Sequence, residues 1–234
     1  MPQVYVERRQ SLPSGGADGT QVQLRGTKYG EAAVQVFGPV LYPLANEGQY
    51  FSAMTVTPGT AYTLTAAAQN AFSATQALWV LRNTDAEGAK RVFVDHARIV
   101  FATAGTAGTR VEVAIAIDNI NRYSSGGTAQ TIANVNMDSA TATVAAINAG
   151  AVTAAAVSGA VRYIYRGTLS TAIPAVGETH YLDFGGKIHS THVNKTLCVG
   201  PVVLGGGDSL VVHLWLPSQS AAPTGELQMA WWER

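Results

Sequence analysis

The densest group of potential metal ligands lies between residues 180 and 192. His189 and His192 are three positions apart, and His180 and Asp183 precede them. Imidazole and carboxylate groups are common zinc ligands. In a strand, residues i and i+3 point to opposite faces, so this spacing suits only a helix or a tight loop. We therefore interpret these residues as loop histidines and predict no metal site.

Asp95 and His96 are neighbours and could belong to a hydrolase triad completed by a serine from elsewhere in the chain. The sequence has no Gly-x-Ser-x-Gly motif, which positions the nucleophile in one large class of hydrolases. Adjacent residues in a strand also face opposite ways, so Asp95 and His96 are expected to point apart. The pair therefore predicts no catalytic site.

Two other features could suggest chemistry. The glycine-rich run 205–208 resembles a phosphate-binding loop, but such loops act through a following helix, and here a Val/Leu/Trp run follows. We predict a turn. The acids Glu112, Glu178, Asp183 and Glu226 are scattered, and their spacing pairs no two of them as a glycosidase requires. The sequence thus predicts no catalytic residue, no cofactor and no enzyme.

The chain carries few charges and they cancel. Hydrophobic residues make up 47% of the 234 residues and charged residues only 13%, with fifteen Lys+Arg against fifteen Asp+Glu. A nucleic-acid binder normally carries a basic excess, so no nucleic-acid partner is expected. A neutral, weakly charged surface is typical of surface buried in an assembly, and we predict a homo-oligomer. A neutral secreted domain with a Ser/Thr/Asn surface is the alternative.

The single cysteine, Cys198, lies in an apolar run, so it is expected to be a buried, inert thiol outside any internal disulfide. The N-terminus lacks the apolar core of a signal peptide, and no run of roughly 18 apolar residues is present. We expect no membrane partner. The expected route is synthesis in a cytoplasm and release other than by secretion, for example by lysis.

Period-two alternation of apolar and polar residues dominates the chain from about residue 50. It is cleanest over 109–117, and it recurs over 160–167, where Tyr163 and Tyr165 are expected on one face. Further strands are expected at 51–57, 61–65, 77–82, 91–101, 197–204, 210–216 and 226–234. Turn residues separate these runs. The pattern predicts an all-β protein, a jelly-roll-like antiparallel β-sandwich of about eight core strands.

Three segments need separate interpretation. Residues 1–48, punctuated by glycine and proline, are expected to form an extended N-terminal arm, with the jelly-roll body at 49–234. The alanine-rich stretch 139–157 is expected to be extended or irregular, with a helix as the alternative. The last two runs, 210–216 and 226–234, are separated by turn residues and are expected to pair as a hairpin.

Large aromatic residues supply candidates for a subunit interface. In the last run Trp231 falls on one face with the other apolar residues, and Trp232 falls on the other face. Because Trp and Tyr are enriched at interfaces, we take Trp215, Trp232, Tyr163 and Tyr165 as interface candidates. A sugar-binding surface is the alternative use of the same side chains.

Several segments resemble minor structural proteins of tailed bacteriophages, over roughly residues 75–234. They are 77–83, 126–128, 134–138, 202–210, 213–223 and 232–234. The resemblance implies a virion protein, made in the host cytoplasm, that decorates and cements the head shell, often as a jelly-roll trimer. Its partners would be the major capsid protein or other virion subunits. The alternative is a host-binding module of a tail or head fibre that recognises a carbohydrate or another receptor.

Overall fold

The computed structural model describes residues 41–234, except 56, 58, 67, 68, 87 and 185–195. The chain divides into two units, Met1–Tyr42 and Pro43–Arg234. The predicted arm, residues 1–48, lies almost wholly outside the described residues and stays a prediction. Its described end contains a short helix, α1 (Leu41–Asn46), which a turn at Gly48 separates from the first strand.

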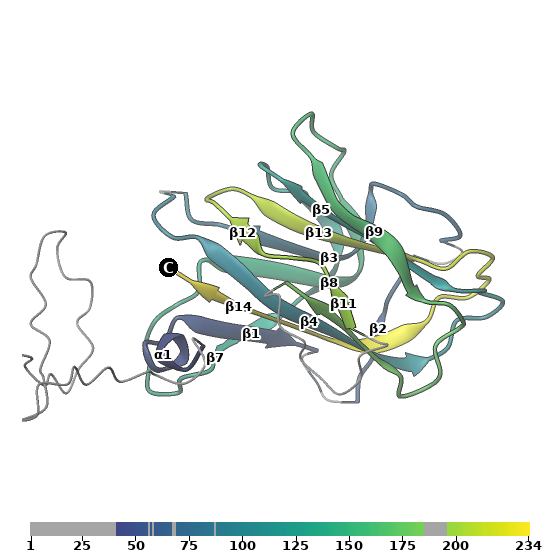
Figure 1. Ribbon diagram of the computed structural model, residues 1–234, viewed down its shortest axis with the longest axis horizontal. Coiled ribbons are helices and arrows are strands. Elements are labelled where there is room, and N and C mark those ends of the chain that lie inside the picture. The colour runs from purple at the N-terminus through teal and green to yellow at the C-terminus, as the bar shows by residue number, and fades with distance from the viewer. Residues whose placement is uncertain (1–40, 56, 58, 67–68, 87, 185–195) are drawn as a thin grey trace, which may run out of the picture. The chain divides into compact units, whose positions relative to one another are not determined.

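Apart from α1, the regular structure in the described residues is β-structure, arranged as two sheets that pack as a sandwich (Figure 1). This arrangement confirms the predicted all-β sandwich. The strands are β1 (Tyr50–Met54), β2 (Tyr62–Thr63), β3 (Gln76–Asn83), β4 (Val92–Thr103), β5 (Val111–Asp118), β6 (Tyr123–Ala129), β7 (Thr131–Asn134), β8 (Ala145–Ala154), β9 (Arg162–Ser170), β10 (Thr179–Asp183), β11 (Thr196–Cys198), β12 (Val202–Leu204), β13 (Ser209–Trp215) and β14 (Thr224–Glu233).

The strand order is that of a jelly roll, a long antiparallel ribbon folded over on itself. Sheet 1 has the order β11-β10-β4-β14-β1-β7, with β12 added beside β4 and β2 beside β14. Sheet 2 has the order β6-β8-β3-β13-β5-β9. The ribbon pairs β1 with β14, β3 with β13, β4 with β10 and β5 with β9, all antiparallel. Successive pairs alternate between the sheets, which brings the first and last core strands together.

The expected hairpin of the last two strands is wrong. β13 pairs with β3 and β5 in sheet 2, whereas β14 pairs with β4 and β1 in sheet 1. Residues 216–223 join the two strands and cross from one sheet to the other. This connection is longer than a hairpin loop, which has about two to five residues. Alternation and turn residues identify a strand, but they do not identify its neighbour.

The inner faces of the two sheets form one continuous core. Trp79 of β3 and Trp231 of β14 are its largest fully buried side chains, and Phe51 of β1 stacks on Trp231 with ring centroids 6.4 Å apart. The opposed orientations predicted for Trp231 and Trp232 are confirmed, because Trp231 lies in this core while Trp232 lies on the outer face of sheet 1. Each burial of such a side chain contributes at least about 1.5–3 kcal/mol.

The alanine-rich stretch is extended, as predicted. Residues 145–154 form β8, which lies between β3 and β6 in sheet 2. Small side chains let the neighbouring backbones approach closely. Gly150 has a φ of +80°, and a Cβ on this residue would lie 2.9 Å from the Cβ of Tyr62. Tertiary pairing has overridden the helix preference of alanine.

Candidate interface surfaces

Two of the four predicted interface residues meet on the outer face of sheet 2. Trp215 of β13 and Tyr163 of β9 lie around Phe72, which comes from the loop before β3, and His213 of β13 completes the group. The Phe72 ring makes edge contacts with Tyr163, His213 and Trp215 at centroid distances of 5.7, 5.2 and 5.6 Å. Phe72 and Tyr163 are exposed, whereas His213 and Trp215 are buried beneath them. We call this group the aromatic cluster.

His213 is held as a neutral imidazole in the aromatic cluster. Its Nδ1 lies 2.7 Å from the carbonyl oxygen of Gln76, which can only accept, so Nδ1 carries the proton. Nε2 is buried without a hydrogen-bond partner among the described residues. Burial lowers the pKa of His213, against the hydrogen bond to Gln76, which favours the charged form. The cluster is therefore an uncharged, weakly hydrated surface near neutral pH.

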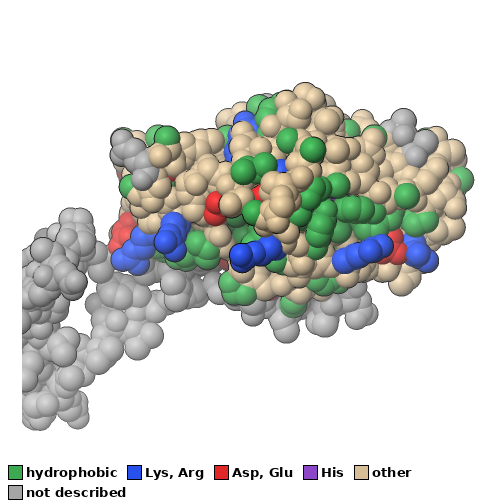
Figure 2. Space-filling model, turned by 90° about the horizontal axis from the view of Figure 1, so that it is seen from above, with side chains coloured by type: hydrophobic (Ala, Val, Ile, Leu, Met, Phe, Trp, Pro, Cys, Tyr) green, Lys and Arg blue, Asp and Glu red, His purple; other side chains and the backbone are tan. Residues whose placement is uncertain are grey.

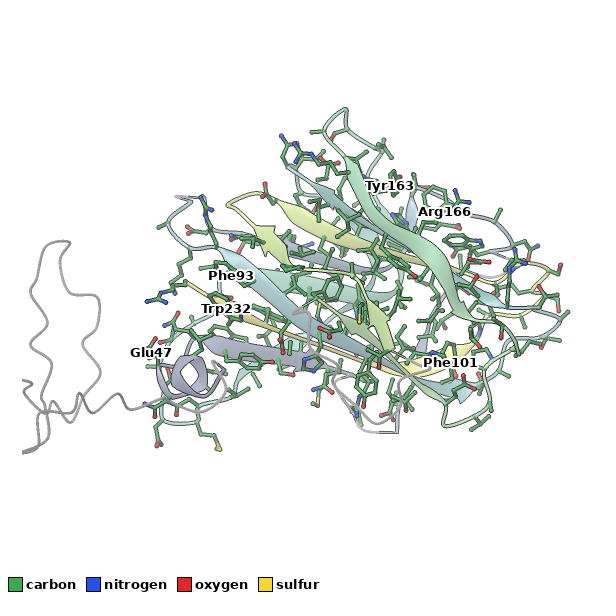
Figure 3. All side chains as sticks on the ribbon, in the orientation of Figure 1. Glu47, Phe93, Phe101, Tyr163, Arg166 and Trp232 are labelled. Carbon is green, nitrogen blue, oxygen red and sulfur yellow. The ribbon has the colours of Figure 1, made fainter. Side chains whose placement is uncertain are left out.

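Tyr165 does not belong to this surface, although it was expected on the same face as Tyr163. In the pairing of β5 with β9, Ile115 lies opposite Tyr165 and Ala116 lies opposite Tyr163, so Ile164 is an extra residue in a β-bulge. The bulge reverses the alternation. Tyr163 faces outward, while Tyr165 packs against the core. Figure 3 shows Tyr163 together with Arg166 on β9.

The fourth candidate, Trp232, contributes to a separate surface on sheet 1. It stacks on Phe93 of β4 with ring centroids 3.7 Å apart and planes within 1°. The strand register places Val203 beside Phe93, and Tyr50 beside Trp232. Val135 follows β7 and donates its backbone N–H to the carbonyl oxygen of Tyr50, which extends the same register. These five side chains form a line across five neighbouring segments, which we call the apolar row.

Asp95 and His96 adjoin the apolar row, and the expectation that they point apart is wrong. In the pairing of β4 with β14, His96 lies opposite Ala230 and Val94 lies opposite Trp231, so Asp95 is an extra residue in a bulge. Both side chains can then share one face. Asp95 Oδ2 lies 2.9 Å from His96 Nδ1 and accepts a hydrogen bond of 2.7 Å from the Tyr50 hydroxyl.

This hydrogen bond fixes the ring of Tyr50 at the apolar row. Burial, and after it the hydrogen bond to the Asp95 carboxylate, raise the pKa of the Tyr50 hydroxyl. The hydroxyl therefore stays protonated and serves as a donor. Tyr50 consequently presents its ring, and not a charge, to the outer face of sheet 1.

The other potential ligands are only partly described. His189 and His192 lie outside the described residues. His180, which is buried in β10, lies 2.7 Å from Glu178 through its Nε2, and Asp183 is buried at the end of the same strand. Within the described part of the chain, no group of three or more His, Cys, Asp or Glu side chains could hold a metal ion.

The scattered acids have separate partners. Glu112 pairs with Arg110 on sheet 2, Glu178 with His180, and Glu226 accepts a hydrogen bond from the backbone N–H of Gly59. Because these partners lie on different strands and loops of the described structure, each acid takes part in its own local hydrogen bonding.

Two further sequence interpretations are settled by the strands after residue 195. The run 205–208 is a turn between β12 and β13, as predicted, and Asp208 Oδ2 closes it by accepting a hydrogen bond of 2.7 Å from the Gly205 N–H. The expectation of a buried thiol is wrong, because Cys198 is exposed. It ends the three-residue strand β11, which pairs with β10 at the border of sheet 1, so an apolar run need not be buried there.

A buried ion pair among the loops at the strand ends of sheet 2 was not predicted from the sequence. The Arg122 and Asp118 side chains are fully buried, and Arg122 Nη1 lies 3.3 Å from Asp118 Oδ2. Arg122 also donates to the carbonyl oxygens of Ala74 and Ala155, each at 2.9 Å. Spacing alone could not indicate this pair, because Asp118 ends a strand and Arg122 follows in a loop. The pair fixes the loops around sheet 2.

A small pocket of about 180 Å³ lies beside this pair. Its lining includes Asp118, Arg162, Val203 and Asp208. The volume is below the roughly 300–1,000 Å³ of sites for drug-sized ligands. This pocket is therefore too small for a ligand of that size.

The surface carries few charges. Figure 2 views the molecule from above the orientation of Figure 1, where β5 and β9 lie uppermost. Hydrophobic side chains gather near the middle of this face, and Lys and Arg side chains are spaced around them.

Within the described residues, no helix is long and apolar enough to cross a membrane. No protein-family model, no curated protein and no solved structure matches the chain.

Proposed function

We propose that this chain is a non-enzymatic structural protein of a bacteriophage particle, a decoration protein that binds the head shell and stabilises it. The resemblance of residues 75–234 to phage minor structural proteins supports this function, and so does the jelly-roll order of the strands. The proposed partners are the major capsid protein or other virion subunits, together with further copies of the chain.

The observation that most favours this role is a pair of apolar surfaces on opposite sheets. The aromatic cluster lies on the outer face of sheet 2 and the apolar row on the outer face of sheet 1. A protein whose work is to clamp other subunits needs two contact surfaces, since one surface would only attach it. Uncharged surface costs little to desolvate when such contacts form.

The location of the protein in the virion tests this proposal. Gold-labelled antibodies against the purified full-length chain are applied to particles of the phage whose genome encodes the chain. Labels over the head surface are expected, and the protein should remain with the heads when tails are sheared off. A protein detected in infected cells, yet missing from purified particles by mass spectrometry, contradicts a virion role.

A host-binding module is the second candidate, favoured by one specific observation. Phe72 and Tyr163 expose their rings beside each other, with Arg166 on the same outer face, a combination suited to stacking on a sugar. Binding to a glycan array that is lost in Tyr163→Ala and kept in Phe93→Ala favours this role. Gold label at tail or head fibres, together with glycan binding, replaces the decoration role with host recognition.

A further inference from the structure

We propose that the apolar row is a two-fold contact through which two copies of this chain bind each other. The row comprises Val203, Phe93, Trp232, Tyr50 and Val135, taken from β12, β4, β14, β1 and the segment after β7. Val203 and Val135, at its two ends, expose 42% and 45% of their surface. Strands lie about 4.8 Å apart, so the four spacings make a row about 19 Å long.

The row is self-complementary, which is the property that a two-fold interface requires. Trp232 occupies its centre, with one aromatic ring on each side, Phe93 and Tyr50, and one valine at each end. A two-fold axis parallel to β14 reverses the row. It places Trp232 on Trp232 of the second copy, Phe93 on Tyr50, and Val203 on Val135.

Arg91 and Glu47, beyond the ends of β4 and β1, form the charge pair that this arrangement brings together. Arg91 and Arg234 lie two positions beyond Phe93 and Trp232, and their backbones hydrogen-bond to each other, so both project from the outer face. Glu47 precedes β1 and is exposed, and Asp138 is exposed in the turn after β7. The axis that reverses the row brings Arg91, on the β4 side of one copy, to the β1 side of the other, where Glu47 lies. Arg234 lies on the line of β14 itself and meets Arg234 of the second copy.

The surface around the row has to complete the interface. Stable interfaces bury about 800 Å² on each partner, which is more than one row provides. The next residues on this face of β1 and β14 include Ser52, Met54 and Gln228, which are uncharged, and Met54 is exposed. On β4, His96 beside Asp95 and Arg98 opposite Gln228 add charged and polar groups. A central aromatic row with polar and charged residues around it matches the usual arrangement of a protein interface.

This inference does not rest on the phage role. It predicts an even number of copies, whereas the resemblance implies three. The mass of the full-length chain in solution separates the two. Sedimentation equilibrium over roughly 1–100 µM protein is expected to give twice 24.5 kDa. A monomer over this range, or three times 24.5 kDa, overturns the two-fold contact and leaves the virion proposal to its own test.

Paired substitutions at the ends of the row test its direction. Val203→Lys and Val135→Asp each place one charge against an apolar residue of the second copy. Each is expected to raise the dimer dissociation constant by about tenfold or more. In the double variant every Lys meets an Asp of the other copy, and dimerisation is expected to recover. Within one chain the two positions are about 19 Å apart, too far for an internal pair.

Control variants exclude a general effect of charge. Val157→Lys and Val176→Asp alter valines that are 42% and 72% exposed and lie outside the row, and they should leave the dissociation constant unchanged. Arg91→Glu, Glu47→Arg and their double variant repeat the test with residues that already carry charge, in case a valine variant fails to fold. Controls that weaken the dimer as much as the single variants, or double variants without recovery, overturn the proposed geometry.

Discussion

Replacing Arg122 by methionine should strongly destabilise the sandwich, because its charge is fully buried. Methionine retains the apolar stem of arginine and removes only the guanidinium. The perturbation therefore leaves Asp118 buried without its cation, and it leaves the carbonyl oxygens of Ala74 and Ala155 without these donors.

The magnitude follows from what remains buried. Breaking a buried ion pair by removing one partner costs about 3–5 kcal/mol, because the other charge stays desolvated. Asp118 Oδ1 keeps a hydrogen bond of 2.5 Å from the Ser158 hydroxyl, so the carboxylate is not wholly without donors, and we expect a loss of about 3 kcal/mol. This is a substantial part of the about 5–15 kcal/mol that stabilises a domain.

Urea denaturation at one fixed protein concentration measures the loss, and the midpoint is expected to fall by about 1–2 M. Arg110→Met is the matched control, because Arg110 is also paired with a carboxylate, that of Glu112, but lies exposed, where such pairs contribute about 0–1 kcal/mol. Adding Asp118→Asn to Arg122→Met should restore part of the stability. Equal effects at Arg122 and Arg110, or no recovery in the double variant, refute the reasoning.

Removing residues 226–234 takes out most of β14, which lies between β4 and β1, and should prevent folding. The reason is that burial of Leu227, Met229 and Trp231 together contributes on the order of 6 kcal/mol to stability. A soluble product with an unchanged thermal transition in circular dichroism contradicts this prediction. Folding lowers the pKa of His213, so below about pH 6.5 the unfolded chain binds a proton at this imidazole that the folded chain does not bind. The free energy of unfolding therefore falls by up to about 1.4 kcal/mol for each pH unit below that value. Denaturation at pH 7 and 5 should show a smaller decrease in His213→Gln, and equal decreases refute the assignment. Deleting residues 1–40 should leave the sandwich folded by circular dichroism and abolish binding to particles, and an unfolded product places the arm in the core.

Local patterning predicted most of the strands and their inward faces. Period-two alternation identified β5 and β14, including the opposed orientations of Trp231 and Trp232. It could not identify which strands are neighbours, so β13 and β14 were expected to pair although they lie in different sheets. Neighbours in a jelly roll are distant in sequence, and their pairing depends on the whole ribbon.

Bulges account for two of the errors at the surfaces. One extra residue reverses the alternation that follows it, and this happens at Asp95 in β4 and at Ile164 in β9. As a result Asp95 lies with His96, and Tyr165 faces the core. A bulge leaves no mark in composition, since any residue can occupy it. Phe72, Phe93 and Arg122 were missed for another reason, namely that their contacts come from segments far apart in the chain.

The composition of the apolar row couples assembly to completed folding. Its members span residues 50–232, and Trp232, at the centre, belongs to the last strand. Before β14 lies between β4 and β1, Tyr50 and Phe93 have no common neighbour, so the row does not exist in a partly folded chain. A surface on an earlier hairpin would expose apolar side chains during synthesis and promote aggregation. Binding through the apolar row therefore requires that β1 and β14, the first and last core strands, have already paired.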